Sequence, residues 1–387
     1  MKKINHPWEC GALTVIMGLS VLAGLFWLTV GPRSEFSENE NRMLQTFPQL
    51  RLSDLADGSY MKSMEGYVCD QFPLRDQFVD LCTRTQLFFG KSELNSDYST
   101  QPGKAGVYFG GNGHLYEPTL PDTEQTFEEN AAALGAFAKK EGIPFYLLPV
   151  PSAAQEQSEN LPVYAAPGDQ LRDFRILEQN VGSHGNVINL FPLLSLKNAG
   201  DVYFKTDHHW NMQGAYLGYQ ALIRAMGKPC VPLSDYSVRN AAQPFYGTLY
   251  SKAVYGGQQS DSFSYPVWNG MNLVTVQVGT NQSKGIYRTE FLDRKDKYSV
   301  YLGGNPAVAV VRNPLSSGGK LLLLKDSFAN SMLPYLCRDF SEIHMVDLRY
   351  FNQDLSGYLS RNGIREAAAV YSIQQLCDVS IASKLPG

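Results

Sequence analysis

The sequence predicts an α/β domain of three layers, in which helices cover both faces of a mostly parallel sheet. The first observation is that short apolar runs of strand length alternate with helical stretches between residues 126 and 227. The second is that the same alternation returns between residues 320 and 373, after a segment of different character. Strands that alternate with helices are typical of parallel sheets buried on both faces.

The composition limits the classes of function. The chain has 387 residues, a formal net charge of -4 and 44% hydrophobic residues. This hydrophobic content is ample for a packed core, and the length fits one large domain or two ordinary ones. The mild acidity, with no run of Lys or Arg, disfavours nucleic acid, since phosphate binding needs a basic surface. We therefore expect no nucleic-acid partner.

The N-terminal part predicts a membrane anchor. Residues 11–30 carry no charge, Lys2 and Lys3 precede them, and acidic residues dominate the segment that follows. About 20 apolar residues cross a bilayer as a helix, and the positive flank stays in the cytoplasm. A cleaved signal peptide and a buried soluble helix are the alternatives. We expect a single-pass helix in the lipid bilayer of the cell membrane, with residues 1–31 as cytoplasmic stub and anchor and residues 32–387 as an extracytoplasmic catalytic domain.

The cysteine spacing indicates no metal or redox motif. No C-x-x-C occurs among the six cysteines, which are Cys10, Cys69, Cys82, Cys230, Cys337 and Cys377. Zinc ribbons and thioredoxin-like motifs are therefore unsupported. A location outside the cytoplasm would permit disulfides. Cys69 with Cys82 and Cys337 with Cys377 are possible pairs, and free buried thiols are an equal alternative.

The segment before the alternating region is expected to be mixed. Residues 31–52 are expected to form an extended arm. Residues 53–89 are expected to be helical, because apolar residues recur three and four positions apart, with an interruption at "FPLRD". Residues 106–117 are expected to form a hairpin around Gly-Gly-Asn-Gly.

The first half of the alternating region has clear helix boundaries. Gly142 and Gly227 are expected to end helices, and Asn211 is the expected N-cap of the helix that ends at Gly227. The expected helices are 126–142, 168–182 and 211–227, and the expected strands are 143–151 and 185–191.

The residue pattern of segment 240–312 predicts a β-rich insertion or a lid. Short aromatic and β-branched runs, such as "YGTLYSKAV", "GIYRTEFL" and "YSVYLGG", are separated by Gly, Asn and Pro. The alternation then resumes. Strands are expected at 320–327, 342–348 and 367–373, and helices at 328–340 and 350–363.

One candidate for chemistry follows the strand of four leucines. Ligands of parallel sheets bind at the carboxyl ends of the strands, and Lys325, Asp326 and Ser327 lie at such an end. A helix that begins there would supply backbone N–H groups. Ser327 is therefore placed as a nucleophile beside an oxyanion hole. The alternative is that Ser327 caps the helix.

A second candidate is the stretch "KTDHHWNMQG", residues 205–214. A serine nucleophile needs a base, and the base needs a carboxylate that orients it. In an extended chain, residues two apart share a face, so Asp207 and His209 should face each other and His208 should point elsewhere. Zinc needs three or four ligands, and the other histidines lie in unrelated contexts. We therefore predict neither a metal nor another cofactor, and a polar turn that caps the next helix is the alternative.

The stretch "FKTDHHWNMQGAY" resembles the signature of the bacterial DHHW family, which is related to the alginate O-acetyltransferases of the SGNH-hydrolase-like superfamily. The resemblance extends, in order along most of the chain beyond the anchor, to "SENENRMLQTFP", "DQFPLRD", "GVYFGGNGHLYE", "FYGTLYSK", "LLLLKDSFANS" and "MVDLRYF". It implies an SGNH-hydrolase-like fold and a triad of Ser327, His209 and Asp207. The order of these residues is permuted relative to the usual SGNH hydrolases, but geometry rather than order defines a triad.

The resemblance also implies oxyanion-hole donors, for which Gly247 and Asn330 are the candidates. Arg349 follows a strand end and is a candidate for binding an anionic substrate, with a surface ion pair as the alternative. Three aromatic residues could stack on sugar rings or could serve only in packing: Trp210, Tyr246 and Tyr350.

The leading functional hypothesis is acyl transfer, with O-acetylation of an exported or cell-surface polysaccharide as the inference from the family. A polytopic membrane acyltransferase would then deliver the acetyl group to Ser327. The second hypothesis is a carbohydrate acetylesterase with the same triad, and the third is a non-catalytic glycan-binding or assembly protein that keeps the fold.

Overall fold

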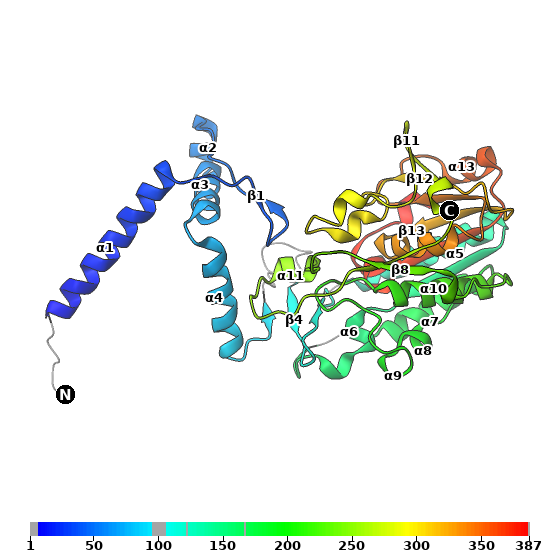
Figure 1. The fold of residues 1–387 in the computed structure, drawn as a ribbon, viewed down its shortest axis with the longest axis horizontal. Coiled ribbons are helices and arrows are strands. Elements are labelled where there is room, and N and C mark those ends of the chain that lie inside the picture. The colour runs from blue at the N-terminus through cyan, green and yellow to red at the C-terminus, as the bar shows by residue number, and fades with distance from the viewer. Residues whose placement is uncertain (1–6, 95–105, 121–122, 166–167, 386–387) are drawn as a thin grey trace. The chain divides into compact units, whose positions relative to one another are not determined.

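The computed structural model describes residues 7–94, 106–120, 123–165 and 168–385 (Figure 1). The chain forms two compact units, one of Met1–Gly90 with Val254–Gly256, and one of Lys91–Ala253 with Gly257–Gly387. The structure thus groups the chain into units that divide after Gly90. The expected boundary between anchor and catalytic domain, at residues 31 and 32, stays a prediction.

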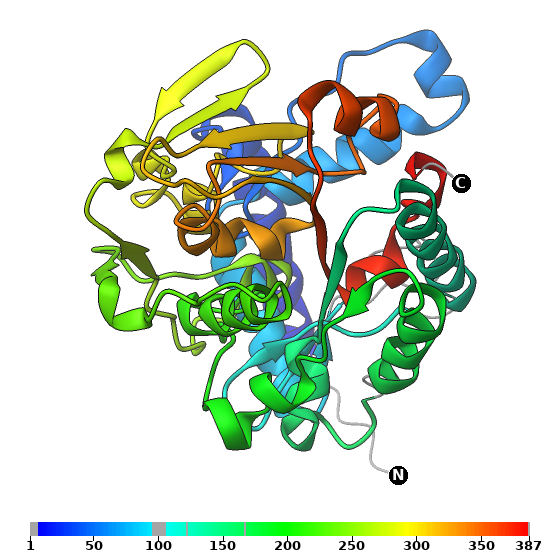
Figure 2. The ribbon, with the colours of Figure 1, turned by 90° about the vertical axis from the view of Figure 1, so that its right-hand side faces the viewer.

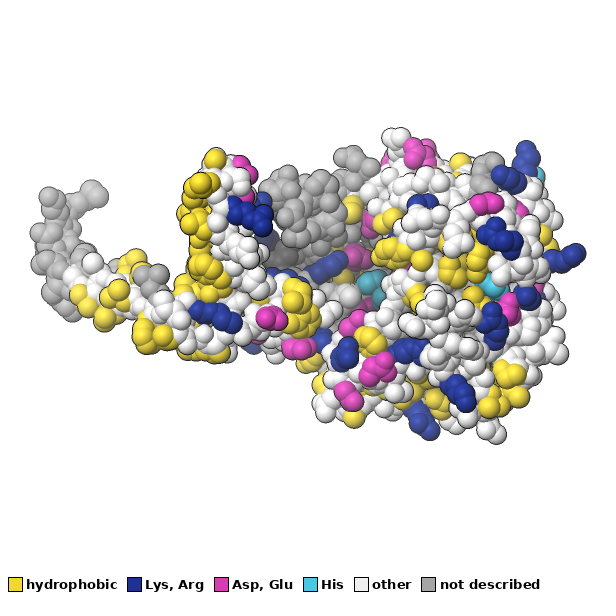
Figure 3. All heavy atoms as spheres, turned by 90° about the horizontal axis from the view of Figure 1, so that it is seen from above, with side chains coloured by type: hydrophobic (Ala, Val, Ile, Leu, Met, Phe, Trp, Pro, Cys, Tyr) yellow, Lys and Arg dark blue, Asp and Glu magenta, His cyan; other side chains and the backbone are white. Residues whose placement is uncertain are grey.

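The first unit is helical. It contains α1 (Pro7–Val30), α2 (Leu52–Ala56), α3 (Ser59–Gln71) and α4 (Arg75–Phe88), so the helices expected between residues 53 and 89 are confirmed. The expected extended arm includes a small antiparallel pair, β1 (Phe36–Ser37) and β2 (Arg42–Met43). Figure 3 shows hydrophobic side chains along these helices, and on α4 Phe78, Leu81 and Phe88 are exposed.

The predicted transmembrane helix is not supported. Residues 11–30 do lie within one helix, α1. Among the residues that the structure describes, however, no helix has both the length and the apolar character needed to cross a membrane.

The second unit is built on an eight-stranded sheet with the strand order β11-β10-β12-β14-β13-β15-β6-β7. Neighbouring strands from β14 to β7 are parallel, and those from β11 to β14 are antiparallel. The parallel strands are β6 (Phe145–Val150), β7 (Asn186–Val187), β13 (Lys320–Lys325), β14 (Glu342–Val346) and β15 (Ala367–Ser372). The predicted mixed α/β fold with a large, mostly parallel sheet is therefore confirmed.

Helices pack on both faces of this sheet (Figure 2). Leu321 and Leu323 of β13 pack with α10 (Met212–Ala225). Leu322 and Leu324, which point to the opposite face, pack with α5 (Glu124–Glu141), α7 (Gln170–Val181) and α13 (Leu355–Asn362). Successive residues of a strand face opposite sides, so a run of four leucines fits a strand covered on both faces.

The β-rich segment 240–312 is partly an extension of the sheet. Its strands β10 (Thr275–Val278), β11 (Asn281–Lys284) and β12 (Val308–Arg312) form the antiparallel edge. Three expected strands were wrong, because "YGTLYSK" contains helix α11 (Thr248–Lys252), and the runs near 289–291 and 297–300 are 3-10 helices. In the last two runs, Phe291, Tyr298 and Tyr301 pack in a separate cluster with Phe204, Phe245 and Phe263, so their spacing reflects this cluster rather than strand alternation.

The remaining elements of the second unit are short. The expected hairpin is present as β4 (Val107–Phe109) and β5 (Leu115–Tyr116), to which β3 (Glu93–Leu94) pairs. The expected helix at 328–340 is instead a 3-10 helix, η6 (Ser327–Met332), followed by α12 (Leu333–Leu336). Further short elements are α6 (Ala153–Glu156), α8 (Phe191–Leu194), α9 (Leu196–Ala199), α14 (Ile373–Asp378), the pair β8 (Ser237–Asn240) and β9 (Ser264–Val267), and the 3-10 turns Ser158–Asn160, Leu233–Asp235, Met271–Leu273 and Ala382–Lys384.

The two possible disulfides are absent. Cys337 and Cys377 are buried free thiols, and Cys69 and Cys82 are exposed free thiols. The alternative of unpaired thiols is therefore the correct one for these four residues.

Candidate active site

Ser327 lies just after the carboxyl end of β13 and lines a cavity there. Asp326, not Ser327, is the N-cap of η6, because its Oδ1 accepts a hydrogen bond of 2.9 Å from Phe328 N–H. Its Oδ2 accepts a second bond of 2.6 Å from Ser372 N–H at the end of β15. Asp326 thus fixes two strand ends, and the hydroxyl of Ser327 is free of a capping role.

His209 connects Ser327 to Asp207. The His209 Nε2 lies 2.6 Å from Ser327 Oγ, and its Nδ1 lies 2.5 Å from Asp207 Oδ1. Asp207 Oδ1 also accepts a 3.0 Å hydrogen bond from the backbone N–H of His209. We assign the tautomer in which Nδ1–H donates to the carboxylate, so that Nε2 accepts the hydroxyl proton of Ser327. The predicted pairing of Asp207 with His209 across two positions is what the structure shows.

The carboxylate of Asp207 is buried and fully engaged. Its Oδ2 accepts hydrogen bonds from Thr248 N–H at 2.7 Å and from the Thr248 hydroxyl at 2.9 Å. Burial alone would raise the pKa of Asp207, but the two neighbouring imidazoles and these donors outweigh it and hold the pKa well below its usual range. Asp207 is therefore an anion at neutral pH.

His209 is held neutral by its surroundings. Burial and the neighbouring His208 lower its pKa to about 4, against the opposing effect of Asp207. The ring of Tyr298 stacks on the imidazole with centroids 3.8 Å apart, and the Tyr298 hydroxyl donates to the carbonyl of Ser327 at 3.0 Å. A general base must be neutral and must direct a lone pair at the proton it removes. His209 meets both conditions, because the lone pair of its Nε2 faces the Ser327 hydroxyl.

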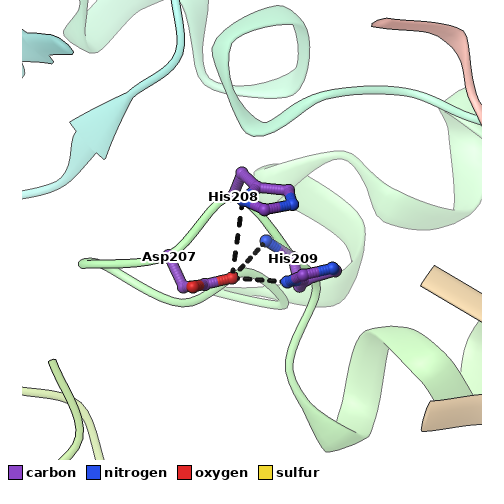
Figure 4. Close-up of side chains that lie close together, drawn as sticks. All are labelled: Asp207, His208 and His209. Carbon is purple, nitrogen blue, oxygen red and sulfur yellow. Dashed lines mark hydrogen bonds and ion pairs between the residues drawn. The ribbon is translucent and has the colours of Figure 1, made fainter. Parts of the chain in front are cut away.

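His208 takes a different position from His209, as predicted, but it remains near the same carboxylate (Figure 4). Its Nδ1 lies 2.8 Å from Thr248 Oγ1 and 3.8 Å from Asp207 Oδ1. Asp207, His208 and His209 offer metal-ligand atoms within 4.8 Å of one another. Both oxygens of Asp207 already accept two hydrogen bonds each, so the arrangement is that of a hydrogen-bonded dyad rather than of an open metal site.

The oxyanion-hole candidates are placed differently from the expectation. The N–H of Gly247 donates to Thr206 Oγ1 at 3.0 Å, and a Cβ at this position would come within 2.3 Å of the Asp207 carboxylate. The backbone of Gly247 therefore lies so close to Asp207 that a side chain would not fit, and its N–H is already used by Thr206. The amide of Asn330 lines the cavity, but its Nδ2 donates to Asn305 Oδ1 at 3.0 Å.

Two polar groups beside Ser327 remain without protein partners. Within the part of the chain that the structure describes, the backbone N–H of Ser327 donates to no acceptor, and the buried Oδ1 of Asn330 has no hydrogen-bond partner. The N–H of Ser327 is therefore the one expected oxyanion donor that the structure leaves available.

Arg349 lines the cavity but is committed to a buried ion pair. Its Nε and Nη2 donate to the two oxygens of Asp347 at 2.9 and 2.6 Å, and its Nη1 donates to Gln375 at 3.2 Å. Asp347 is fully buried, and Lys325 Nζ lies 3.7 Å from it. The ion pair that was the alternative for Arg349 is therefore present. Its partner, Asp347, lies in the interior and not on the surface.

The three aromatic candidates do not line the cavity. Trp210 has no exposed surface, and its indole N–H donates to Phe328 O at 3.1 Å and to Ser331 Oγ at 2.8 Å. For Trp210 the packing alternative therefore holds, because its ring is enclosed in the core. Tyr246 contacts the ring of Tyr250, and Tyr350 is exposed beside the guanidinium of Arg349.

The cavity around Ser327 has a volume of about 370 Å³, and most of the residues that line it are polar. In addition to Asp207 it is lined by the carboxylates of Glu117, Asp296, Asp326 and Asp378. Sequence reasoning missed Thr248 and Tyr298, which contact the catalytic candidates. Thr248 lies in the "FYGTLYSK" segment of the family resemblance, which is a signal that could have found it; Tyr298 has no comparable signal.

Comparison with known proteins agrees with these observations. A family profile described as DHHW protein matches residues 172–346, a span that contains Asp207, His209 and Ser327. No curated protein sequence matches the chain. The resemblance to the DHHW family that the sequence motifs suggested is therefore confirmed for this span.

Solved structures share the fold at low sequence identity. A DHHW family protein from Eubacterium siraeum is 20% identical, with a TM-score of 0.59 over 74% of this chain and 96% of that chain. PatB1 of Bacillus cereus, solved with a sulfonyl adduct, is 23% identical, with a TM-score of 0.60 over 72% of this chain and 100% of that chain. The O-acetyltransferase domain of Pseudomonas putida AlgJ is 15% identical, with a TM-score of 0.45 over 72% and 94% of the two chains. The first two similarities establish the fold.

Proposed function

Since residues 172–346 match the DHHW family, we propose that the protein transfers acyl groups through an acyl-serine intermediate on Ser327. The observation that carries this proposal is the continuous chain of hydrogen bonds from Ser327 Oγ through His209 to Asp207, with distances of 2.6 and 2.5 Å. This is the arrangement by which a serine hydroxyl becomes a nucleophile at neutral pH.

The first half-reaction forms the acyl-serine. Ser327 Oγ attacks the carbonyl carbon of the acyl donor, and its proton passes to His209 Nε2. Asp207 stabilises the resulting imidazolium through Nδ1–H, while the N–H of Ser327 faces the developing oxyanion. The bond to the leaving group then breaks, and His209 returns the proton to the leaving oxygen or sulfur. The acyl group remains on Ser327.

The second half-reaction regenerates the serine. A hydroxyl of the acceptor gives its proton to His209 and attacks the acyl-serine carbonyl, and the bond to Ser327 Oγ breaks as His209 returns the proton to it. With a sugar hydroxyl as acceptor the reaction is O-acetylation of a polysaccharide, which we propose as the function on the basis of the family resemblance. With water as acceptor the protein would be a carbohydrate acetylesterase of SGNH type.

The nucleophile is tested with a Ser327→Ala variant and a sulfonyl fluoride. The wild-type protein should hydrolyse p-nitrophenyl acetate and should gain one sulfonyl group on Ser327, located by mass spectrometry. Ser327→Ala should lose both reactions, whereas the control Ser360→Ala, on the exposed face of α13, should retain them. Full activity in Ser327→Ala would refute the proposed nucleophile and favour a glycan-binding protein that keeps the fold.

A second experiment distinguishes transfer from hydrolysis by varying the acceptor of the acetyl group. The acetyl-enzyme is formed from p-nitrophenyl acetate with and without a panel of cell-wall oligosaccharides, and the products are separated by chromatography. An acetylated sugar supports the transferase. Release of acetate at the same rate with every oligosaccharide supports the esterase.

The location and the donor protein are further parts of the proposal. We propose that Ser327 acts outside the cytoplasm, with a polytopic membrane acyltransferase as acetyl donor, because acetyl-CoA is cytoplasmic and the exported polymer is not. Protease treatment of intact cells should degrade the second unit if it lies outside. Protection from protease until the cells are lysed would place it in the cytoplasm and exclude this part of the proposal.

A further inference from the structure

His208 and Thr248 form a second hydrogen-bonded chain to the carboxylate of Asp207, besides the direct bond from His209. His208 Nδ1 lies 2.8 Å from Thr248 Oγ1, which lies 2.9 Å from Asp207 Oδ2. The ring of His208 lies beside that of His209, with centroids 3.9 Å apart. His209 thus contacts Oδ1 directly, whereas His208 is linked to Oδ2 through the Thr248 hydroxyl group. Figure 4 shows that His208 also lies near Oδ1, at 3.8 Å.

The direction of the hydrogen bonds follows from the charge of Asp207. An ionised carboxylate accepts hydrogen bonds but cannot donate them. The single hydroxyl proton of Thr248 is therefore directed to Asp207, where the bond is charge-assisted. Thr248 Oγ1 then accepts a hydrogen bond from His208, which assigns the proton of His208 to Nδ1. The chain runs from His208 Nδ1–H through the Thr248 hydroxyl to Asp207 Oδ2.

We propose that His208 and Thr248 are positioning residues for the acyl transfer described above, on which this inference rests. They hold Asp207 Oδ2 in place, so that Oδ1 faces the Nδ1–H of His209 and keeps the imidazole in the tautomer that accepts the serine proton. Without the hydroxyl of Thr248, Oδ2 retains one donor, the Thr248 N–H. Without His208, the Thr248 hydroxyl loses the hydrogen bond that holds its oxygen in place beside Oδ2.

The surroundings of the carboxylate favour this role over simple packing. Asp207 is 1% exposed, and the backbone at Gly247 approaches it so closely that a Cβ there would lie 2.3 Å from Oδ2. The side chain of His208 is 29% exposed, so the chain runs from the cavity wall to an interior anion. Both histidines of the doublet therefore act on Asp207, and each does so from a different side.

Two pairs of substitutions test the inference in the full-length protein. Thr248→Val keeps the shape and removes the hydroxyl, whereas Thr248→Ser keeps the hydroxyl. His208→Phe keeps a ring beside His209 and removes Nδ1–H, whereas His208→Asn places an amide N–H near the position of Nδ1. The matched control is His114→Phe, since His114 pairs with Asp201 and does not line the cavity.

The first measurement is the second-order rate constant for labelling of Ser327 by phenylmethylsulfonyl fluoride. Thr248→Val and His208→Phe should lower it about 10- to 100-fold, the range expected for a displaced catalytic group. Thr248→Ser, His208→Asn and the control should stay within about threefold of the wild-type rate. Circular dichroism and the melting temperature identify any variant that fails to fold.

The second measurement is the proton resonance of the short Nδ1–H bond between His209 and Asp207. This far-downfield signal should be lost or displaced in Thr248→Val and His208→Phe and retained in Thr248→Ser and His208→Asn. A wild-type signal and a wild-type labelling rate in Thr248→Val and His208→Phe would overturn the inference. An equal loss in all four variants would also overturn it, because only packing would then matter. Absence of labelling at Ser327 in the wild type would instead refute the proposed function, and the resonance would still decide the positioning role.

Discussion

Asp207 makes four hydrogen bonds as an acceptor, two from His209 and two from Thr248, although it lies in the interior. A buried carboxylate is costly unless each lone pair is satisfied, and here the donors come from both sides of the group. Because the anion persists, it can stabilise a positive charge that appears on His209 for part of the reaction.

Replacement of Asp207 by Asn should abolish most of the catalysis. The amide cannot stabilise an imidazolium and favours the wrong tautomer of His209, so kcat should fall by about 10,000-fold. Hydrolysis of p-nitrophenyl acetate measures the change, with Asp201→Asn as the control, because Asp201 pairs with His114 instead. More than a tenth of wild-type kcat in Asp207→Asn would exclude the proposed role.

The pH dependence of activity should reflect the depressed pKa of His209. Burial and His208 lower this pKa to about 4, below the ordinary value of 6.5. Protonation removes the base, so kcat/KM should be independent of pH at neutrality and should fall only as the pH approaches 4. The measurement is kcat/KM for a neutral ester from pH 3.5 to 8. A midpoint at or above pH 6.5 would show that the imidazole is not held neutral as described.

At the residue scale, the sequence predicted the interactions that are local. Asp207 and His209 are two positions apart, and an extended chain places such residues on one face. Thr248 meets Asp207 across 41 positions, and Tyr298 reaches Ser327 across 29 positions, so both contacts depend on the tertiary fold. For Trp210 the sequence left stacking and packing both open, because an aromatic residue next to a site can equally be an interior one.

At the element scale, helix α10 supports the site through its small residues. Gly218 lies against the ring of Trp210, which in turn donates to the carbonyl of Phe328 beside the nucleophile. Asn211 accepts from Gln213 N–H and Gly214 N–H, so the predicted N-cap is confirmed. The start of α10 and the position of Ser327 are thereby linked through one indole ring.

A Gly218→Ala substitution should destabilise the second unit. The added Cβ would lie 2.6 Å from the Trp210 ring, and overpacking of this kind lowers the free energy of unfolding by about 1–3 kcal/mol. Urea denaturation provides the measurement. The control is Gly66→Ala in α3, where the added Cβ meets Gln45 at an ordinary 3.7 Å and should be neutral or stabilising. Equal stability of Gly218→Ala and wild type would show that Trp210 has room to move.

Most strands of the parallel part could be predicted, since continuous apolar runs such as residues 320–325 are typical of buried strands. The antiparallel edge could not, because a local residue pattern shows that a run favours a strand but not which strand it pairs with, as β12 does with β14. Helix α11 was missed because its β-branched and aromatic residues favour a strand locally, and tertiary contacts override that preference.

At the scale of the whole molecule, all of the proposed machinery lies in one of the two units. Asp207, His209, Thr248 and Ser327 belong to the second unit, as do the two core clusters on the faces of the sheet. The sequence predicted one catalytic domain from residue 32 onward, since nothing in its composition marks a boundary near residue 90. The first unit is defined by contacts within Met1–Gly90 and Val254–Gly256, and no linker of distinctive composition marks it.

Residues 91–387, which keep only Val254–Gly256 of the first unit, should therefore fold and react without its helices. Their expression as a separate protein should give a single cooperative melting transition and labelling of Ser327 by a sulfonyl fluoride at about the wild-type rate. An unfolded product, or a folded product that is not labelled, would show that the first unit is required.

The charge of the cavity predicts which acyl groups it accepts. Asp207 and Asp296 line it, and its Arg349 is committed to Asp347. Glu117 is neutralised by Lys252 at 2.7 Å, and burial raises the pKa of Asp326 and raises that of Asp378 to about 7, so the effect is best measured at pH 8. A p-nitrophenyl succinate ester, which carries a carboxylate, should therefore have a kcat/KM at least about tenfold below that of the neutral butyrate ester of similar length. Equal values at low ionic strength would show that the carboxylates do not face the substrate.

The place of β15 in the sheet has a consequence for biosynthesis. This strand, Ala367–Ser372, lies between β13 and β6 and follows all other strands that the structure describes. Ser372 also supplies the N–H that holds Asp326, next to the nucleophile. A ribosome must therefore release the chain up to Ser372 before the centre of the sheet can close. Until then β6 and β13 have an unpaired edge each, and a nascent chain cut short before residue 367 would expose both to aggregation instead of yielding an active fragment.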